Sequence, residues 1–224
     1  MIIGAIGWLV LSYLVGAIPT SYLAGWLFKG IDLREHGSRN LGATNVYRVL
    51  GWKYAIPVGL VDVAKGAGPV WLAGAWGPDI ALFPLYCGVA AVVGHVFSVF
   101  VGMSGGKGVA TASGVVLALA PKALLVALVI WALLVWLTGY VSVGSVVSAA
   151  LFPFAAYFLE GARGGVLIVE AALAAFLVWK HRANLQRLMR GTENRFGRRG
   201  GRAAAAAGSV PAATDGSEPA GRAP

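Results

Sequence analysis

Three polar segments, whose residue types suit the binding of phosphate esters, interrupt an otherwise apolar chain. They are Arg34 to Arg48 (REHGSRNLGATNVYR), Ser104 to Thr111 (SGGKGVAT) and His181 to Asn194 (HRANLQRLMRGTEN). Each combines lysine or arginine with small or amide residues, so charge and neutral hydrogen-bond donors occur together. Segments of this polarity do not lie in lipid. We therefore expect all three to meet on one side of a membrane and to form a site for a phosphate-bearing substrate.

The second segment is rich in glycine and precedes an apolar run. Its backbone N–H groups, the positive end of the following helix and the ammonium of Lys107 suit a phosphate. A flexible turn with a lysine that reaches the surface explains the fragment equally well. The segment is not a Walker A loop, because that motif needs glycine at Val101 and serine or threonine at Gly108, which argues against an NTPase. The predicted phosphate contacts are Gly105, Gly106, Lys107 and Gly108.

The first and third segments supply the remaining candidates. Arg48 offers charge in the first segment, and Ser38, Thr44 and Asn45 offer neutral donors. A plain basic loop attracted to anionic lipid is the alternative, although it does not need so many small polar residues. In the third segment His181 and Asn184 are three residues apart, so they share one face of a helix. Anchoring at the membrane interface is the alternative there.

Charged residues within the apolar runs favour structural roles. Asp62 and Lys65 are three apart and are predicted to neutralise each other on one helical face. We expect His95 to be a neutral histidine bonded to a neighbouring helix. Cys87 is the sole cysteine and is expected to be buried, so neither a disulfide framework nor metal-ligand spacing is present.

The composition is that of an integral membrane protein. The 224 residues are 58% hydrophobic and 12% charged, and the mean hydropathy is +0.75, which leaves too little polar surface for a soluble domain of this size. The net charge of +9 is concentrated in the polar segments and the C-terminal tail. That distribution indicates membrane topology and anionic ligands, and it argues against nucleic acid.

The apolar runs predict an all-α protein with seven transmembrane helices. Lys29 is the first basic residue, and the arginines gather after Lys180, so the positive-inside rule places the N-terminus outside and the C-terminus in the cytoplasm. Pro121 divides the run from 109 to 140 into two helices, the first too short to span without tilt. We expect one domain at 1–199, with cytoplasmic loops at 30–53, 102–108 and 180–199, and a disordered tail at 200–224. The predicted spans are 1–28, 54–75, 80–101, 109–120, 122–137, 141–159 and 165–179.

The motifs together resemble a known family. GAIPTSYLAG, DLREHGSRNLGATNVYRVLG, DVAKG, GHVF, GGKGVATASG, GYVS and HRANLQRL occur in this order between Gly16 and Asn194. They are similar to those of the bacterial PlsY-type glycerol-3-phosphate acyltransferases. The resemblance implies transfer of a fatty acyl group from acyl phosphate to the 1-hydroxyl of glycerol 3-phosphate, the first step of phospholipid synthesis. It also implies a multi-pass protein of the bacterial inner membrane with its active site facing the cytoplasm, and we expect a monomer among membrane lipids.

Roles in the site follow from the same resemblance. It implies that Ser38, Lys107 and Asn184 are catalytic. It also implies that the remaining candidates of the three polar segments bind substrate and that Ser142 of GYVS is a further substrate contact. No cofactor or metal is expected, and a substrate phosphate is expected to accept the hydroxyl proton unless His181 is the base. Two positions depart from the family pattern, Arg39 where glycine is usual and Ser98 where proline is frequent. The predicted substrate-binding residues are Thr44, Asn45, Arg48, Gly105, Gly106, Gly108, Ser142 and His181.

Two other classes of protein remain possible from the residues. A transporter for a phosphorylated anion needs polar groups near the midplane and usually two related halves. Here the polar groups collect at one face, and no internal repeat is evident. A non-catalytic scaffold leaves the polar segments unexplained.

Overall fold

The computed structural model describes residues 2–196, which are helical with connecting loops and contain no strand. The predicted all-α class is therefore confirmed for this part of the chain, and the predicted disordered tail lies outside it. The helices are α1 (Ile2–Ala17), α2 (Thr20–Lys29), α3 (Ala43–Leu50), α4 (Trp52–Trp76), α5 (Phe83–Val96), the short 3₁₀ turn Val99–Val101, α6 (Val109–Leu119), α7 (Pro121–Thr138), α8 (Val141–Leu159), α9 (Gly164–Lys180) and α10 (Arg182–Met189).

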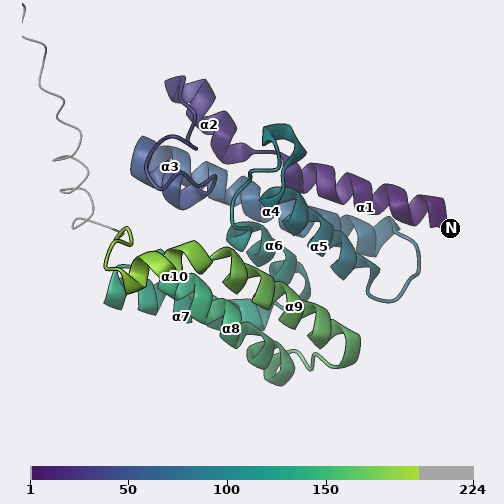
Figure 1. The fold of residues 1–224 in the computed structure, drawn as a ribbon. Helices are drawn as coiled ribbons and strands as arrows, with labels where there is room; N and C mark the ends of the chain where they lie inside the picture. Colours follow the sequence, from purple (N-terminus) through teal and green to yellow (C-terminus); the bar gives the residue numbers. More distant parts are fainter. Residues whose placement is uncertain (1, 197–224) are drawn as a thin grey trace, which may run out of the picture.

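Two groups of helices pack on either side of α6. The first contains α1 to α5, in which α1 lies along α5, and the second contains α7 to α10, in which α7 and α9 flank α8 (Figure 1). Helix α6 packs against α4 and α5 on one side and α7 on the other. The short helices α3 and α10 lie at one end of the molecule, and the N-terminus lies at the other (Figure 1). This arrangement brings the three polar segments to the same end.

Each predicted span corresponds to helical structure, but the lengths differ. Five stretches are long and apolar enough to cross a membrane: Ile2–Lys29, Trp52–Trp76, Phe83–Val101, Pro121–Thr138 and Val141–Leu159. A sixth is obtained if α9 and α10, which are bent by 47° at their junction, count as one. Helix α6 has 11 residues, or about 16 Å at 1.5 Å per residue, so it is too short to span alone. The sequence prediction of a short helix at 109–120 is confirmed.

The first span is broken, which the sequence prediction of one continuous helix missed. Pro19 has no N–H to continue the hydrogen bonding of α1, so the chain turns before α2 begins. The carbonyls at the break are used by neighbouring helices. Ser98 Oγ donates to Ala17 O, and Lys65 Nζ donates to Ile18 O at 2.8 Å. The break therefore ties α1 to α4 and to the segment that follows α5.

Small residues allow α4 and α6 to cross in contact. A Cβ atom on Gly66 would collide with Thr111 O, and one on Gly114 would collide with Val63 O. Such mutual glycine contacts are typical of helix pairs in membranes, where close backbone approach drives packing. The small residues of α6 and α8 have two different roles. Gly114 packs α6 onto α4 and Gly144 packs α8 onto α7, whereas Ala110, Ser113, Ser145 and Ser148 line a cavity.

Candidate active site

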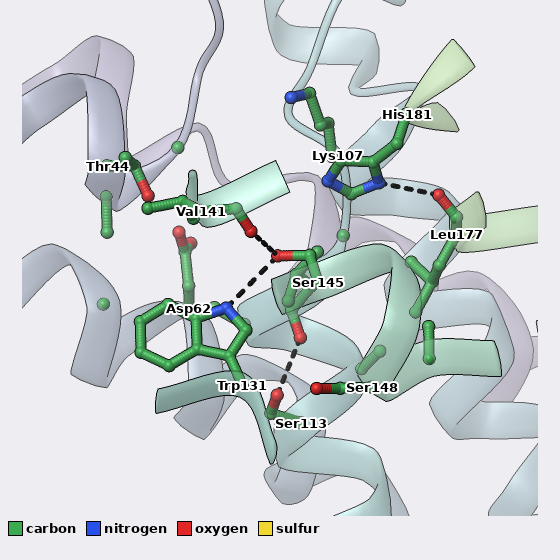
Figure 2. A pocket seen from close by; sticks show the side chains of 18 of the residues that line it. Thr44, Asp62, Lys107, Ser113, Trp131, Val141, Ser145, Ser148, Leu177 and His181 are labelled. Carbon is green, nitrogen blue, oxygen red and sulfur yellow. Dashed lines mark hydrogen bonds between the residues drawn. The ribbon is translucent and has the colours of Figure 1, made fainter. Parts of the chain in front are cut away.

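A cavity of about 670 Å³ lies beneath the three polar segments. Its walls come from α3 to α10 and from the polar loops. One end is lined by Ser38, Thr44, Arg48, Lys107 and His181, and the interior is lined mainly by leucine, valine and alanine. Figure 2 shows Lys107 beside His181, with Thr44 and Asp62 across the pocket. The cavity therefore joins a cationic end to an apolar interior.

Asn45 holds the first polar segment in shape. Its side-chain amide donates to the carbonyls of Leu33 and His36, both at 3.1 Å, and its Oδ1 accepts the backbone N–H of Ser38 at 2.7 Å. Both ends of this amide are hydrogen-bonded within the loop, so Asn45 positions Ser38. Asn45 also lines the cavity, and its expected contact with substrate stays a prediction. Ser38 and Thr44 line the cavity with their side chains half-buried.

The glycine-rich segment places Lys107 in the cavity but not all of its glycines. The N–H groups of Gly105 and Gly106 donate to Val96 O and His95 O, both at 3.1 Å, and neither residue lines the cavity. The end of α5 already uses these two amides. Their geometry therefore does not support the expectation that they bind phosphate. Gly108 and the first residues of α6 do line the cavity, so the positive end of that helix faces it.

Lys107 has no hydrogen-bond or ion-pair partner among residues 2–196. Burial lowers its pKa to about 8, and the nearby cations of Arg187, Arg48 and Lys180 act in the same direction, while Glu193 opposes them. An ammonium held among cations in a half-buried position gains strongly from an anionic ligand. Lys107 is therefore the side chain whose surroundings most favour a bound phosphate.

Glu193 is the centre of the third polar segment. Its carboxylate accepts hydrogen bonds from Ser142 Oγ at 2.9 Å, Asn184 Nδ2 at 2.7 Å and Arg187 Nε at 2.8 Å. These contacts lower the pKa of Glu193 against the opposing effect of burial. Sequence reasoning named Ser142 and Asn184 but missed the acid that joins them, and the only signal for it was a single glutamate in an arginine-rich segment.

His181 ends α9 and is buried. Its Nδ1 lies 2.8 Å from Leu177 O, and because a carbonyl can only accept, Nδ1 carries a hydrogen. The other ring nitrogen lies beside Lys107 (Figure 2). In a neutral ring that nitrogen has a free lone pair, so it is able to accept a hydrogen bond from a substrate hydroxyl.

Arg48 links the first and third segments. Its Nη2 donates to Asn194 O at 3.4 Å, and Tyr47 packs on Phe196 with ring centres 4.7 Å apart. The N–H of Phe196 donates to Gly139 O at 2.7 Å. Residues 193–196 therefore cross the polar end of the cavity and hold the two groups of helices together there.

The predicted ion pair of α4 is confirmed, and it belongs to a larger buried cluster. Asp62 Oδ1 lies 2.8 Å from Lys65 Nζ and 3.6 Å from His95 Nδ1, and it accepts Thr20 Oγ1 at 2.6 Å. His95 thus lies close to Asp62 of the neighbouring helix α4, but the 3.6 Å separation is too long for the hydrogen bond that the sequence predicted. Asp62 and His95 also line the cavity, which the sequence did not indicate. Nowhere in residues 2–196 do three metal-binding side chains lie together.

The two departures from the family pattern have structural explanations. Arg39 has a φ of 58°, so it keeps a left-handed backbone of the kind that glycine adopts easily, and its side chain is exposed. The bulk of Arg39 therefore points away from the site. Ser98 uses its hydroxyl to satisfy the carbonyl of Ala17, a contact that proline does not offer.

Sequence and structure comparisons place these features in a known context. The sequence profile of the family described as glycerol-3-phosphate acyltransferase matches residues 6–191. Proteins of that name from Chlorobaculum parvum and Trichlorobacter lovleyi are 42% and 46% identical, covering 85% and 84% of this chain and 97% and 96% of their own. The crystal structure of PlsY, an integral membrane glycerol 3-phosphate acyltransferase, in its glycerol 3-phosphate form is 38% identical with a TM-score of 0.80, over 86% of this chain and 96% of that one. Its lysophosphatidic acid form is 34% identical with a TM-score of 0.76, over 88% and 98%.

The fold and the cavity define a multi-pass helical membrane protein, an enzyme with a cationic site above an apolar chamber. With the matches above, the chain belongs to the glycerol-3-phosphate acyltransferase family of the PlsY type and is an acyltransferase.

Proposed function

We propose that the protein transfers a fatty acyl group from acyl phosphate to the 1-hydroxyl of sn-glycerol 3-phosphate. The products are 1-acylglycerol 3-phosphate and inorganic phosphate, in the first step of phospholipid synthesis. The observation that carries this proposal is the continuity of the cavity, in which Arg48, Lys107 and Arg187 surround one end and apolar side chains line the rest. A phosphate ester fits the first part and an acyl chain fits the second.

The chemistry needs positioning more than a strong acid or base. The hydroxyl oxygen forms a bond to the acyl carbon, the bond from that carbon to the phosphate oxygen breaks, and the hydroxyl proton passes to the departing phosphate. A phosphate monoester has a second pKa of about 6, so its departure depends on charge stabilisation. Lys107 and the N-terminal end of α6 supply this charge, and Ser38 and Thr44 orient the reacting groups.

Glycerol 3-phosphate is held from the opposite side of the site. Arg48 contributes charge. The second ring nitrogen of His181 and the Oδ1 of Asn184, which have no hydrogen-bond partner among residues 2–196, contribute acceptors for hydroxyl groups. Glu193 keeps Asn184 and Arg187 in place without contacting substrate itself.

The acyl donor enters from the membrane. The cavity walls include Ile56 and Leu60 of α4 and Leu128 of α7, and these side chains are largely exposed. The cavity is therefore open between α4 and α7, where a lipid chain can slide in sideways. With seven crossings, a cytoplasmic active site and an external N-terminus, the protein acts as a monomer in the bacterial inner membrane.

The test measures release of inorganic phosphate by the purified protein in detergent, with palmitoyl phosphate and glycerol 3-phosphate as substrates. We expect release that requires both substrates and falls about 100-fold or more in Lys107→Ala, because one preorganised donor at a developing charge contributes that much. Lys122→Ala is the matched control, since Lys122 is exposed at the far end of α7. Turnover with palmitoyl-CoA but not with palmitoyl phosphate would contradict the proposed donor.

A further inference from the structure

Two polar side chains lie in the apolar part of the cavity without partners. Glu170 of α9 is 3% exposed and Ser148 of α8 is 7% exposed. The Oε2 atom of Glu170 and the Oγ atom of Ser148 are buried and have no hydrogen-bond partner among residues 2–196. By contrast, Ser113 and Ser145, which also line the cavity, each donate to a carbonyl one turn earlier in their helices. Because unpaired buried oxygens are costly, Glu170 and Ser148 require an explanation.

Glu170 marks the end of the cavity along α9. The residues of α9 that line the cavity are Leu177, Ala174, Leu173 and Glu170, and residues 164–169 do not line it. Glu170 is 11 residues from His181, which is about 16 Å along the helix. The hydrocarbon core of a bilayer is about 30 Å thick, so the chains of one leaflet fill about 15 Å. An acyl chain of ordinary membrane length, with its carbonyl near Lys107, therefore ends at the level of Glu170.

We propose that Glu170, assisted by Ser148, limits the length of the acyl chain that the enzyme accepts. This inference rests on the proposed function. A chain that stops short of Glu170 leaves room for water beside the carboxyl group. A longer chain presses its methyl end against Oε2 of Glu170, which has no hydrogen-bond partner in the part of the chain that the structure describes. Burying such a polar group against hydrocarbon is unfavourable. The side chain at position 170 thus selects against long donors without touching the reacting atoms.

The experiment compares donors of two lengths, palmitoyl phosphate and arachidoyl phosphate. The measured quantity is the ratio of their kcat/KM values. We expect the natural protein to favour palmitoyl phosphate, and Glu170→Leu to shift the ratio about tenfold toward arachidoyl phosphate, as removal of one unpaired buried polar group predicts. Glu170→Gln keeps a polar end of the same shape and should shift the ratio less than twofold.

Two further variants show whether a change in the ratio is specific to the end of the cavity. Glu160→Gln is the matched control, because Glu160 lies outside the cavity and bonds the first amides of α7 through Oε1. Ser148→Ala provides a milder change and should shift the ratio two- to threefold in the same direction as Glu170→Leu. Turnover of palmitoyl phosphate by each variant reports both its folding and the underlying activity.

Several outcomes would overturn the inference while leaving the proposed function standing. Equal use of both donors by the natural protein would mean that a long tail leaves through the opening between α4 and α7. A Glu170→Leu protein that is active but has an unchanged ratio of kcat/KM values would show that this side chain does not limit the length of the acyl chain. An equal fall for both donors in Glu170→Leu and Glu170→Gln would assign Glu170 a purely structural role. Lack of palmitoyl phosphate turnover by the natural protein, in contrast, would count against the proposed function itself.

Discussion

Two buried glutamates occupy opposite ends of one cavity and differ in how their charge is satisfied. Glu193, 9% exposed, accepts hydrogen bonds from Ser142, Asn184 and Arg187. Glu170, 3% exposed, has an oxygen with no partner among the described residues. The fully bonded acid fixes the side chains around it, whereas the unbonded acid is free to act on whatever fills the cavity. Burial alone therefore does not reveal the role of an acidic residue, but its hydrogen bonds do.

Removal of the carboxylate at the polar end should have the largest effect. Glu193→Ala leaves the buried Asn184 without its acceptor and Arg187 without its ion pair. We expect about 3 kcal/mol of destabilisation, mostly from the buried hydrogen bonds, because Arg187 is partly exposed. Activity should fall about 100-fold as Asn184 loses its position. Thermal unfolding in detergent and phosphate release measure the two effects.

Glu193→Gln is the matched control for that change. It keeps the oxygen that accepts from Ser142 and Asn184, but an amide nitrogen replaces Oε2, so Arg187 loses both the charge and the acceptor that it faces. We expect it to retain most of the stability and at least a tenth of the activity. If Glu193→Ala unfolds no more easily than Glu193→Gln, the hydrogen bonds to Ser142 and Asn184 are not what holds this end together.

A change of pH alters one charge at the polar end and leaves the apolar end of the cavity unchanged. The pKa of Lys107 is lowered to about 8, so the ammonium is present below pH 8 and is lost as the pH rises above it. Binding of a phosphate group should weaken above about pH 8, by up to tenfold per pH unit. Because a bound phosphate favours the ammonium, the fall should occur in kcat/KM before it occurs in kcat.

Lys107→Arg tests whether the titrating group is Lys107. Arginine stays charged throughout this range, so the decline above pH 8 should disappear even if the absolute activity is lower. A decline that persists unchanged in Lys107→Arg would assign it to another group.

The smallest predicted effect lies at the rim of the polar end. Arg39 has a left-handed backbone and an exposed side chain, so Arg39→Gly should relieve about 1 kcal/mol of backbone strain. We expect a slightly higher unfolding temperature and activity within twofold of the natural protein. A large loss of activity would mean that the charge of Arg39 contributes to substrate capture and that the polar end extends further than the cavity lining.

Much of the architecture was predictable because it depends on patterns within single segments. The apolar runs gave the helices, and Pro121 gave the boundary between α6 and α7. The i,i+3 spacing of Asp62 and Lys65 predicted their ion pair, which forms at 2.8 Å. The seven crossings and the orientation of the termini stay predictions, since five or six helices meet the length expected of a span.

The site was harder to predict because its details depend on contacts between segments. The positions of Lys107, His181 and Asn184 along the cavity agree with the expectation from the motifs. No sequence pattern indicates, however, that the amides of Gly105 and Gly106 are taken by the end of α5, or that Asn45 is hydrogen-bonded inside its own loop. Glu170 was missed because a single acid in an apolar run has no local partner to suggest what it faces.

The break at Pro19 has a consequence for how the protein is assembled. Asp62 and Lys65 must enter the membrane within α4, and each finds a partner at the break, where Thr20 and the Ile18 carbonyl lie. Both partners precede α4 in the chain, so they have already been synthesised when the charged helix emerges from the ribosome. Their order in the gene therefore lets the acid and the lysine be neutralised as α4 inserts, before α5 brings His95 to complete the cluster.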